Sequence, residues 1–292
     1  MLDLMLGPSL LSLAAAAMFA LQVLYVRKGL DFTDAITGTC IAIGTSMLIF
    51  WAAAPLYMER AHWSSPALLI FGAVGLFRPS ISTWLSNFAI KEMGPTIAAT
   101  VGAVGPMFTV AGGVLLLAEP LSGYTVLGTV GIVAGVMIIS WRGRATPGTW
   151  AAFALLLPLG SAVLRAVAHI MVKLGLETLP EPFMAGLMGF TVSFAVALPA
   201  ALLQRRRAPR PIPLGGWYWF ALSGVSNAAA IMALNTALRQ GYLVLVGPLT
   251  ATFPLFTLLF SVMFFRQETF TARTLGGVVA ISAGVIVITL LH

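Results

Sequence analysis

The chain has 292 residues, of which 59% are hydrophobic and only 9% are charged, and its mean hydropathy is +0.99. Soluble domains carry about 25% charged residues, so a soluble protein of this size could not bury so much apolar surface. The net charge of +7 comes mostly from basic residues in short segments between apolar runs, where membrane-topology charges belong. The composition therefore indicates a polytopic protein of the lipid bilayer, and it excludes a nucleic-acid-binding surface.

Apolar runs of about 20 residues, long enough to cross the hydrocarbon core, follow one another along the chain. The first run begins Met1-Leu2-Asp3 without a basic segment, so we interpret it as a retained helix and not as a cleaved signal. Barrel strands are about 10 residues long and alternate in polarity, which these runs do not. We predict an all-α polytopic membrane protein of about ten transmembrane helices, at 8–27, 34–57, 66–90, 95–117, 121–141, 149–173, 181–203, 215–238, 242–265 and 270–291.

Two stretches of the chain, 148 residues apart, are nearly the same. The matching blocks are NFAIK at 87–91 with NTALR at 235–239, and PMFT at 106–109 with PLFT at 254–257. A repeat close to half the chain length means two copies of one unit. We therefore predict one five-helix repeat over 1–144 and a second over 145–292.

The charges in the loops predict how the helices are oriented. Only Arg60, Lys173 and Arg239 fall on one side of the membrane, and the richer side is cytoplasmic by the positive-inside rule. Five helices is an odd number, so the second repeat enters from the opposite side, as an inverted repeat. Both termini are then predicted to be periplasmic, in a bacterial inner membrane. The basic residues of the richer side are Arg27, Lys28, Lys91, Arg142, Arg144, Arg205, Arg206, Arg207, Arg210, Arg266 and Arg273.

Pro106 and Pro254 stand in the middle of predicted helices, and Glu119 matches Glu268 at an offset of 149, each before a glycine-rich last helix. With these features the chain resembles the drug/metabolite transporter superfamily, in its EamA-like branch. The resemblance implies a secondary transporter with alternating access. Predicted helices 1, 3, 4, 6, 8 and 9 would enclose a midplane cavity, and helices 5 and 10 would join the halves. Its similarity to YddG-type exporters implies amino-acid export.

Arg78 and Arg165 lie near the middle of the third and sixth predicted helices. An arginine at a helix centre costs about 2.5–3.5 kcal/mol on insertion scales, so each must face a wet cavity, a partner or a ligand. No acidic residue falls at mid-membrane depth, which favours the carboxylate of a substrate as that ligand. The alternative is that each guanidinium bonds backbone carbonyls freed by Pro79 and Pro158.

His169 follows Arg165 by four residues and shares its helix face, where it could line the cavity or carry a proton, or be a hydrogen-bonded interior histidine. The same spacing relates Ser82 to Arg78 and Gln22 to Met18. Pro106 and Pro254 are predicted to kink their helices as hinges, and a passive bend for packing is an equal alternative. The candidate substrate-binding residues are Arg78, Arg165, His169, Gln22, Met18, Ser82, Met107 and Asn227.

Residues outside the candidate cavity are interpreted as structural. Glu119 and Glu268 are expected to cap the helices that follow them. The single cysteine, Cys40, forms no internal disulfide, and no metal-ligand spacing occurs. The glycines expected to permit close helix contacts are Gly102, Gly105, Gly112, Gly113, Gly128, Gly131 and Gly135.

No ATP-binding loop and no cluster of His, Asp, Glu or Cys at one depth occurs, so we predict a monomeric transporter without cofactor, not an enzyme. Proton antiport and facilitated diffusion carry equal weight. Two other solute classes stay open. An exporter of drugs or quaternary cations would need a membrane carboxylate, and an exchanger of phosphorylated metabolites would suit the arginines but usually needs several cationic side chains per phosphate.

Overall fold

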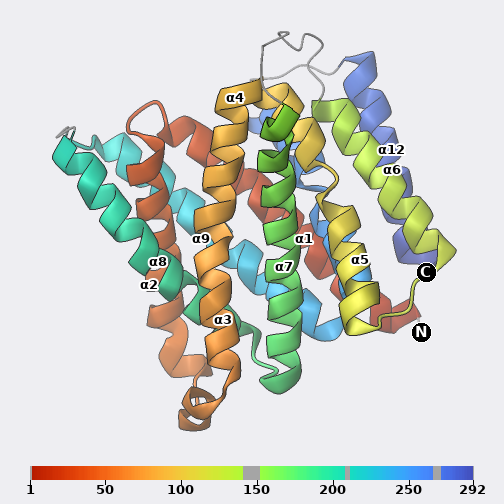
Figure 1. The fold of residues 1–292 in the computed structure, drawn as a ribbon, viewed down its shortest axis with the longest axis horizontal. Coiled ribbons are helices and arrows are strands. Elements are labelled where there is room, and N and C mark those ends of the chain that lie inside the picture. The colour runs from red at the N-terminus through yellow and green to blue at the C-terminus, as the bar shows by residue number, and fades with distance from the viewer. Residues whose placement is uncertain (1, 141–151, 208–210, 266–270, 292) are drawn as a thin grey trace.

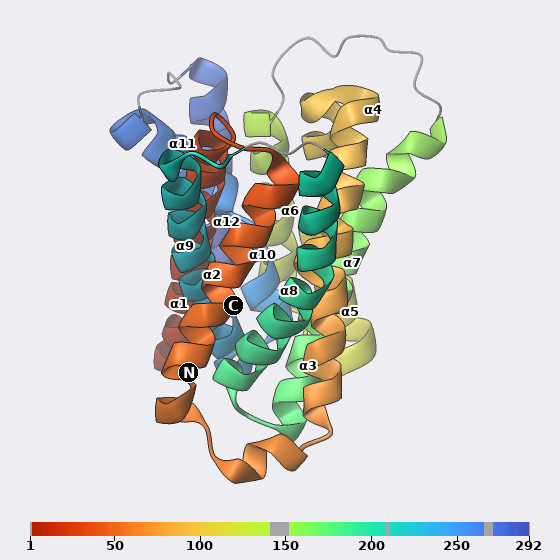
Figure 2. The same cartoon turned by 90° about the vertical axis from the view of Figure 1, so that its left-hand side faces the viewer.

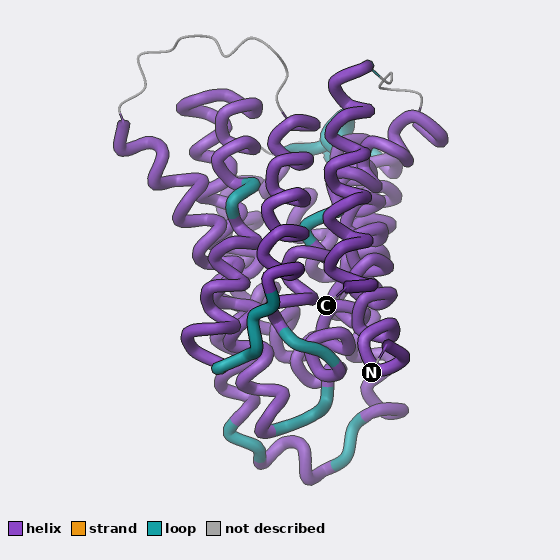
Figure 3. The backbone as a smooth tube through the Cα atoms, turned by 90° about the vertical axis from the view of Figure 1, so that its right-hand side faces the viewer, coloured by secondary structure: helices purple, strands orange, loops and turns teal. Residues whose placement is uncertain are grey.

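The computed structural model describes residues 2–140, 152–207, 211–265 and 271–291, and these form helices and no strand. The helices lie side by side as one bundle (Figures 1, 2 and 3). The α-helices are α1 Leu2–Gly29, α2 Ala35–Tyr57, α3 Ala67–Gly75, α4 Ser82–Gly102, α5 Gly105–Leu117, α6 Gly123–Ser140, α7 Leu156–Thr178, α8 Pro182–Arg207, α9 Leu214–Gln240, α10 Leu243–Thr250, α11 Phe253–Phe260 and α12 Ala272–Leu291. Short 3-10 or π turns cover Arg60–Ser64, Leu76–Ile81, Ala152–Leu155 and Ser261–Phe265.

Nine helical segments within the described ranges are long and apolar enough to cross a membrane, and Ala67–Arg78 forms a shorter apolar helix. The prediction of an all-α polytopic membrane protein with about ten spans is therefore confirmed. The predicted boundary between residues 144 and 145 lies outside the described residues, as do Arg142, Arg144 and Glu268.

The last helix of each half, α6 and α12, packs directly against the other. A Cβ placed on Gly128 would lie 2.7 Å from the carbonyl oxygen of Gly284, and one placed on Gly135 would lie 2.7 Å from that of Gly277. Gly128 and Gly277 are repeat mates, and so are Gly135 and Gly284. Gly128 therefore packs against the mate of Gly135, and Gly135 packs against the mate of Gly128. This reciprocal contact is expected of an inverted repeat, and it needs small residues where the helices touch.

The structure refines three predicted spans. The span at 66–90 is interrupted at Leu76–Ile81. The gap predicted between the spans 66–90 and 95–117 lies within α4, which bends over at one end of the bundle (Figures 1 and 2). Pro106 and Pro254 lie in the first turn of α5 and α11, directly after short breaks that separate these helices from α4 and α10. Each break falls inside a segment of membrane length, Thr100–Leu117 or Leu243–Phe264, and a hinge role for the prolines stays a prediction. Proline lacks an N–H and is tolerated where the helix has no partner for that N–H. Both prolines therefore begin helices at breaks in the fourth and ninth spans.

Helix α7 occupies the position from which a central site can be built. It packs against α3, α4 and α5 of the first repeat and against α8, α9 and α10 of the second repeat, to which it belongs. Figure 1 shows α7 in green between α4 and α5, running from one end of the bundle to the other. Side chains on successive turns of α7 therefore face several helices of both repeats.

Candidate functional site

The site begins at the break after α3. Arg78 has φ −125° and ψ 129°, which is extended backbone inside an otherwise helical segment. The residue before a proline is disfavoured in the α region, and Pro79 follows Arg78. Ser193 of α8 donates from Oγ to the carbonyl oxygens of Gly75 and Arg78, at 2.8 and 2.9 Å. The break is therefore built into the sequence locally and held in place by a serine from the other repeat.

The side chain of Arg78 meets His169 of α7. Arg78 Nη1 lies 2.7 Å from His169 Nε2, and the guanidinium is 5.8 Å from the centre of the Phe19 ring of α1. Arginine only donates, so Nε2 accepts and the imidazole is neutral with its hydrogen on Nδ1. That Nδ1 is buried and has no hydrogen-bond partner among the described residues. The pair therefore presents a donor that is still unsatisfied.

Arg165 stands one helical turn before His169 on α7. A Cβ on Gly102 of α4 would lie 3.8 Å from its Nη2, and Arg165 is close enough to Arg78 to interact with it electrostatically. No described residue accepts a hydrogen bond from the Arg165 guanidinium. Among the acidic residues that the structure describes, Glu92 is exposed within α4, and the others lie at helix ends or between helices. The cluster of Arg78, Arg165 and His169 thus combines two guanidinium groups and one N–H donor, and it suits an anionic group.

The alternative was that Arg78 bonds backbone carbonyls freed by proline. It has no support among the described contacts, because the carbonyl oxygens at the break accept hydrogen bonds from Ser193. Ser82 is buried, and its carbonyl accepts from Ser161 of α7 at 2.8 Å. The i, i+4 argument that put Ser82 beside Arg78 fails, because the break separates them. Sequence reasoning also missed Ser161 and Ser193, whose partners lie 75 to 118 residues away.

The remaining candidates are not joined to the cluster by any contact that the structure describes. Met18 and Gln22 are half-buried on α1 and flank Phe19, which contacts Arg78. Asn227 is buried in α9, and Met107 is 44% exposed in the first turn of α5. Their roles in substrate binding stay predictions. Phe19 was missed because nothing in its apolar surroundings distinguishes it from a packing residue.

The prediction that Glu119 caps the helix that follows it is wrong. Its carboxylate accepts from the backbone N–H groups of Leu243 and Val244, at 2.7 and 2.8 Å, and so caps α10 of the other repeat. Ala118 has a φ of 51°, which turns the chain at the end of α5 and directs Glu119 toward α10. Glu119 is also buried, with 7% of its surface exposed.

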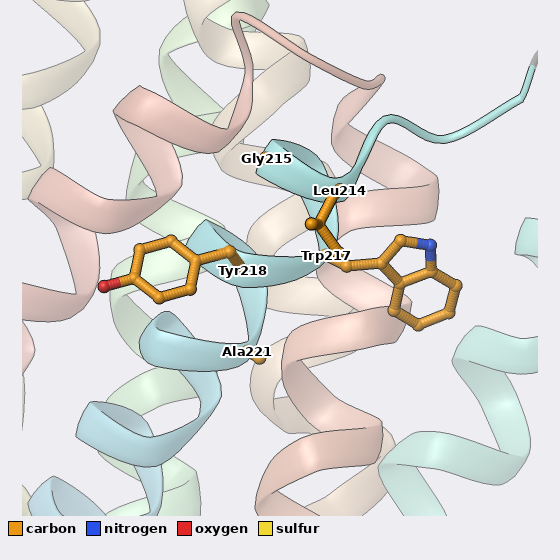
Figure 4. Close-up of a pocket in the computed structure, with 5 residues that line it drawn as sticks. All are labelled: Leu214, Gly215, Trp217, Tyr218 and Ala221. Atoms are coloured by element: carbon orange, nitrogen blue, oxygen red, sulfur yellow. The ribbon is translucent and has the colours of Figure 1, made fainter.

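A second concave feature lies at the start of α9. Leu214, Gly215, Trp217, Tyr218 and Ala221 line an open groove in which the side chains of Trp217 and Tyr218 point to opposite sides of the helix (Figure 4). Its lining carries no charged group. The groove therefore offers no charged side chain to an anionic solute, and the cluster around Arg78 is the better candidate site for an anion.

Comparisons with known proteins agree with this architecture. A comparison with curated proteins gave no match. A solved crystal structure, described only as that of a protein, superposes with a TM-score of 0.79 over 97% of this chain and 96% of its own, at 18% sequence identity. At that identity the likeness shows a shared fold. The pattern of the EamA-like transporter family matches twice, at residues 7–141 and 152–290. The chain therefore belongs to the EamA-like transporter family.

Proposed function

We propose that this protein exports amino acids across the bacterial inner membrane by alternating access, as a monomer. The family to which the chain belongs is a family of membrane-embedded transporters of small solutes and not a family of enzymes. The observation that carries the finer proposal is the cluster of Arg78, Arg165 and His169, which offers hydrogen-bond donors and positive charge without an acid among its described neighbours. A carboxylate provides the acceptors that such groups bind most strongly.

Cations are disfavoured as substrates by the placement of the carboxylates. A cation would need an acid within the bundle, and Glu119, which is buried, has both oxygens bonded to backbone N–H groups. Phosphorylated metabolites satisfy the same arginines and form the second candidate class. The export direction and the periplasmic termini are supported by the resemblance to amino-acid exporters and by the loop charges.

Uptake into proteoliposomes tests the substrate class. We expect transport of free amino acids, and no transport of the same amino acids with an amidated carboxyl group, of quaternary ammonium compounds or of phosphorylated sugars. Equal transport of the amidated compounds would contradict a carboxylate at the cluster. The same vesicles with and without an imposed pH gradient separate the two energy sources, because only proton antiport accumulates the substrate above equilibrium.

Charge removal tests the residues. R165Q and R78Q are each expected to lower transport at least tenfold while the protein still inserts and purifies as a single species. The matched control is R239Q, which removes the same charge from an exposed position at the end of α9. Wild-type transport by both R165Q and R78Q would remove these arginines from the proposed site.

A further inference from the structure

The junction between α9 and α10 is held by two side chains of opposite charge from other helices. Only Gly241 and Tyr242 separate the two helices. Lys173 of α7 donates from Nζ to the carbonyl oxygens of Leu238 and Gly241, both at 2.7 Å. Glu119, as described above, accepts from the first two N–H groups of α10. Each charge has the sign that the helix dipole favours, a cation at the end of α9 and an anion at the start of α10.

The fit around Glu119 leaves no free space. A Cβ on Gly113 of α5 would lie 2.8 Å from Glu119 Oε2 and 2.8 Å from Val244 Cγ1. Further into the bundle, a Cβ on Gly247 of α10 would lie 3.0 Å from the Cβ of Thr109 of α5. Helices α5 and α10 are therefore in direct contact over successive turns. The contact is dry at this point, because Thr109 and Gly247 are both buried.

This contact lies between the Arg78 cluster and one end of the bundle. Arg165, His169 and Lys173 are spaced by four residues on α7, so they share one face and lie about 6 Å apart along the helix. Lys173 is the last of the three and lies toward the end of the bundle that holds the start of α1. Its partner Gly241 shows this position, because a Cβ on Gly241 would lie 2.6 Å from Pro8 of α1. Figure 1 shows the same end, where α7 and α5 terminate near the N-terminus.

The repeat cannot build the same contact at the opposite end. The repeat mates of Leu243 and Val244 are Pro95 and Thr96, at the offset of 148. Proline has no N–H, so a carboxylate there could accept one backbone hydrogen bond where Glu119 accepts two. Residues 95 and 96 also lie within α4, which continues past them, whereas α9 ends before its corresponding position. Among the residues that the structure describes, the doubly bonded carboxylate is therefore found at one end.

We propose that Glu119 and Lys173 form a gate that closes the N-terminal end of the bundle by holding the α9–α10 junction against α5 and α7. Transport requires this gate to open, with release of the first turn of α10 from Glu119. The proposal rests on the proposed transport function, because a gate has a role only in a protein that moves a solute. It assigns to Glu119 and Lys173 a role in access and not in substrate contact.

A cross-link across the closed contact tests the requirement for opening. In a C40A background, T109C and G247C start from a Cβ–Cβ separation of 3.0 Å, slightly below the about 3.5–4.5 Å of a disulfide, so a small outward shift allows the bond. We expect oxidation to form the cross-link, to lower transport at least tenfold, and a reductant to restore it. The oxidised single variants T109C and G247C are the controls. Full transport by the cross-linked protein, or failure of the cross-link to form, would overturn the gate.

A second measurement needs no transport and therefore separates failure of the gate from failure of the proposed function. The thiol of T109C, in the C40A background and without solute, is labelled by a membrane-impermeant maleimide. E119Q places an amide N–H₂ against one backbone N–H, and K173M removes the donor, so each is expected to raise the labelling rate at least tenfold. E59Q, which changes an exposed carboxylate beside the Arg60–Ser64 turn, is the control. Parental labelling rates in both E119Q and K173M would refute the gate.

Discussion

Gly276 and Gly277 are adjacent on α12, and the structure predicts opposite effects for the same substitution at each. A Cβ on Gly276 would meet nothing within 4 Å. A Cβ on Gly277 would lie 2.6 Å from Ile139 Cγ1 and 2.9 Å from the carbonyl oxygen of Gly135 on α6. The optimum between nonbonded carbon atoms is about 3.5–4.0 Å, so α6 and α12 would have to separate.

The magnitude follows from comparing the two variants. Replacing glycine by alanine inside a helix stabilises it by roughly 0.5–1 kcal/mol, and this contribution is the same at both positions. Only G277A adds overpacking, which costs about 1–3 kcal/mol. The difference in free energy of unfolding between G276A and G277A is therefore about 1–3 kcal/mol. At about 2–4 °C per kcal/mol, as for soluble domains of 150–250 residues, G277A should melt roughly 2–12 °C below G276A.

Thermal unfolding of the detergent-purified proteins, followed by size-exclusion chromatography after heating, measures this difference. Wild type is the reference, and G276A is expected to melt at or above it. G128A or G135A should reproduce the loss seen in G277A, because the contacts are reciprocal across the two helices. Equal melting temperatures for G276A and G277A would refute the close packing of α6 on α12.

Two further substitutions test the local structure that supports the site. D34A removes the carboxylate that accepts from the N–H groups of Ile36 and Thr37, at 3.0 Å each, and should cost about 1 kcal/mol in the free energy of unfolding. D31A, which removes an exposed carboxylate three residues before Asp34, should leave the melting temperature unchanged. A decrease in melting temperature as large as in D34A would contradict the capping role of Asp34. S193A leaves the buried carbonyls of the Arg78 break without their donor and should cost about 1–3 kcal/mol, whereas S64A, at an exposed 3-10 turn, should stay within about 0.5 kcal/mol. Equal melting of S193A and S64A would show that the serine does not hold the break.

The sequence alone predicted the features that depend on period and composition. Apolar runs of membrane length predicted the spans, and the 148-residue repeat predicted two related halves, because both are properties of the chain read in order. The glycines of α6 and α12 were also predictable as contact residues, since small side chains at helical spacing permit close approach. The i, i+4 spacing correctly put Arg165 and His169 on one unbroken helix, α7.

The sequence could not show which residues from distant segments meet. The bond between Arg78 and His169 joins residues 91 positions apart, and the carboxylate of Glu119 reaches N–H groups 124 and 125 positions away. Local rules instead assigned Glu119 to its nearest helix. The break at Leu76–Ile81 was missed for a related reason, because the apolar run of the predicted span 66–90 continues through it. Tertiary packing decided these positions.

The tautomer of His169 has a consequence for how the site distinguishes solutes. Because His169 Nε2 accepts a hydrogen bond from Arg78, the hydrogen of the ring is on Nδ1. This buried Nδ1–H can only donate, so it favours a neighbouring atom with a lone pair. If the proposed site binds the solute, an oxygen placed there would satisfy the buried N–H. An analogue of the same shape with a methyl group leaves it unpaired, at a cost of about 1–3 kcal/mol. Since about 1.4 kcal/mol corresponds to tenfold in affinity, one imidazole nitrogen would discriminate between such a pair by roughly 5- to 150-fold.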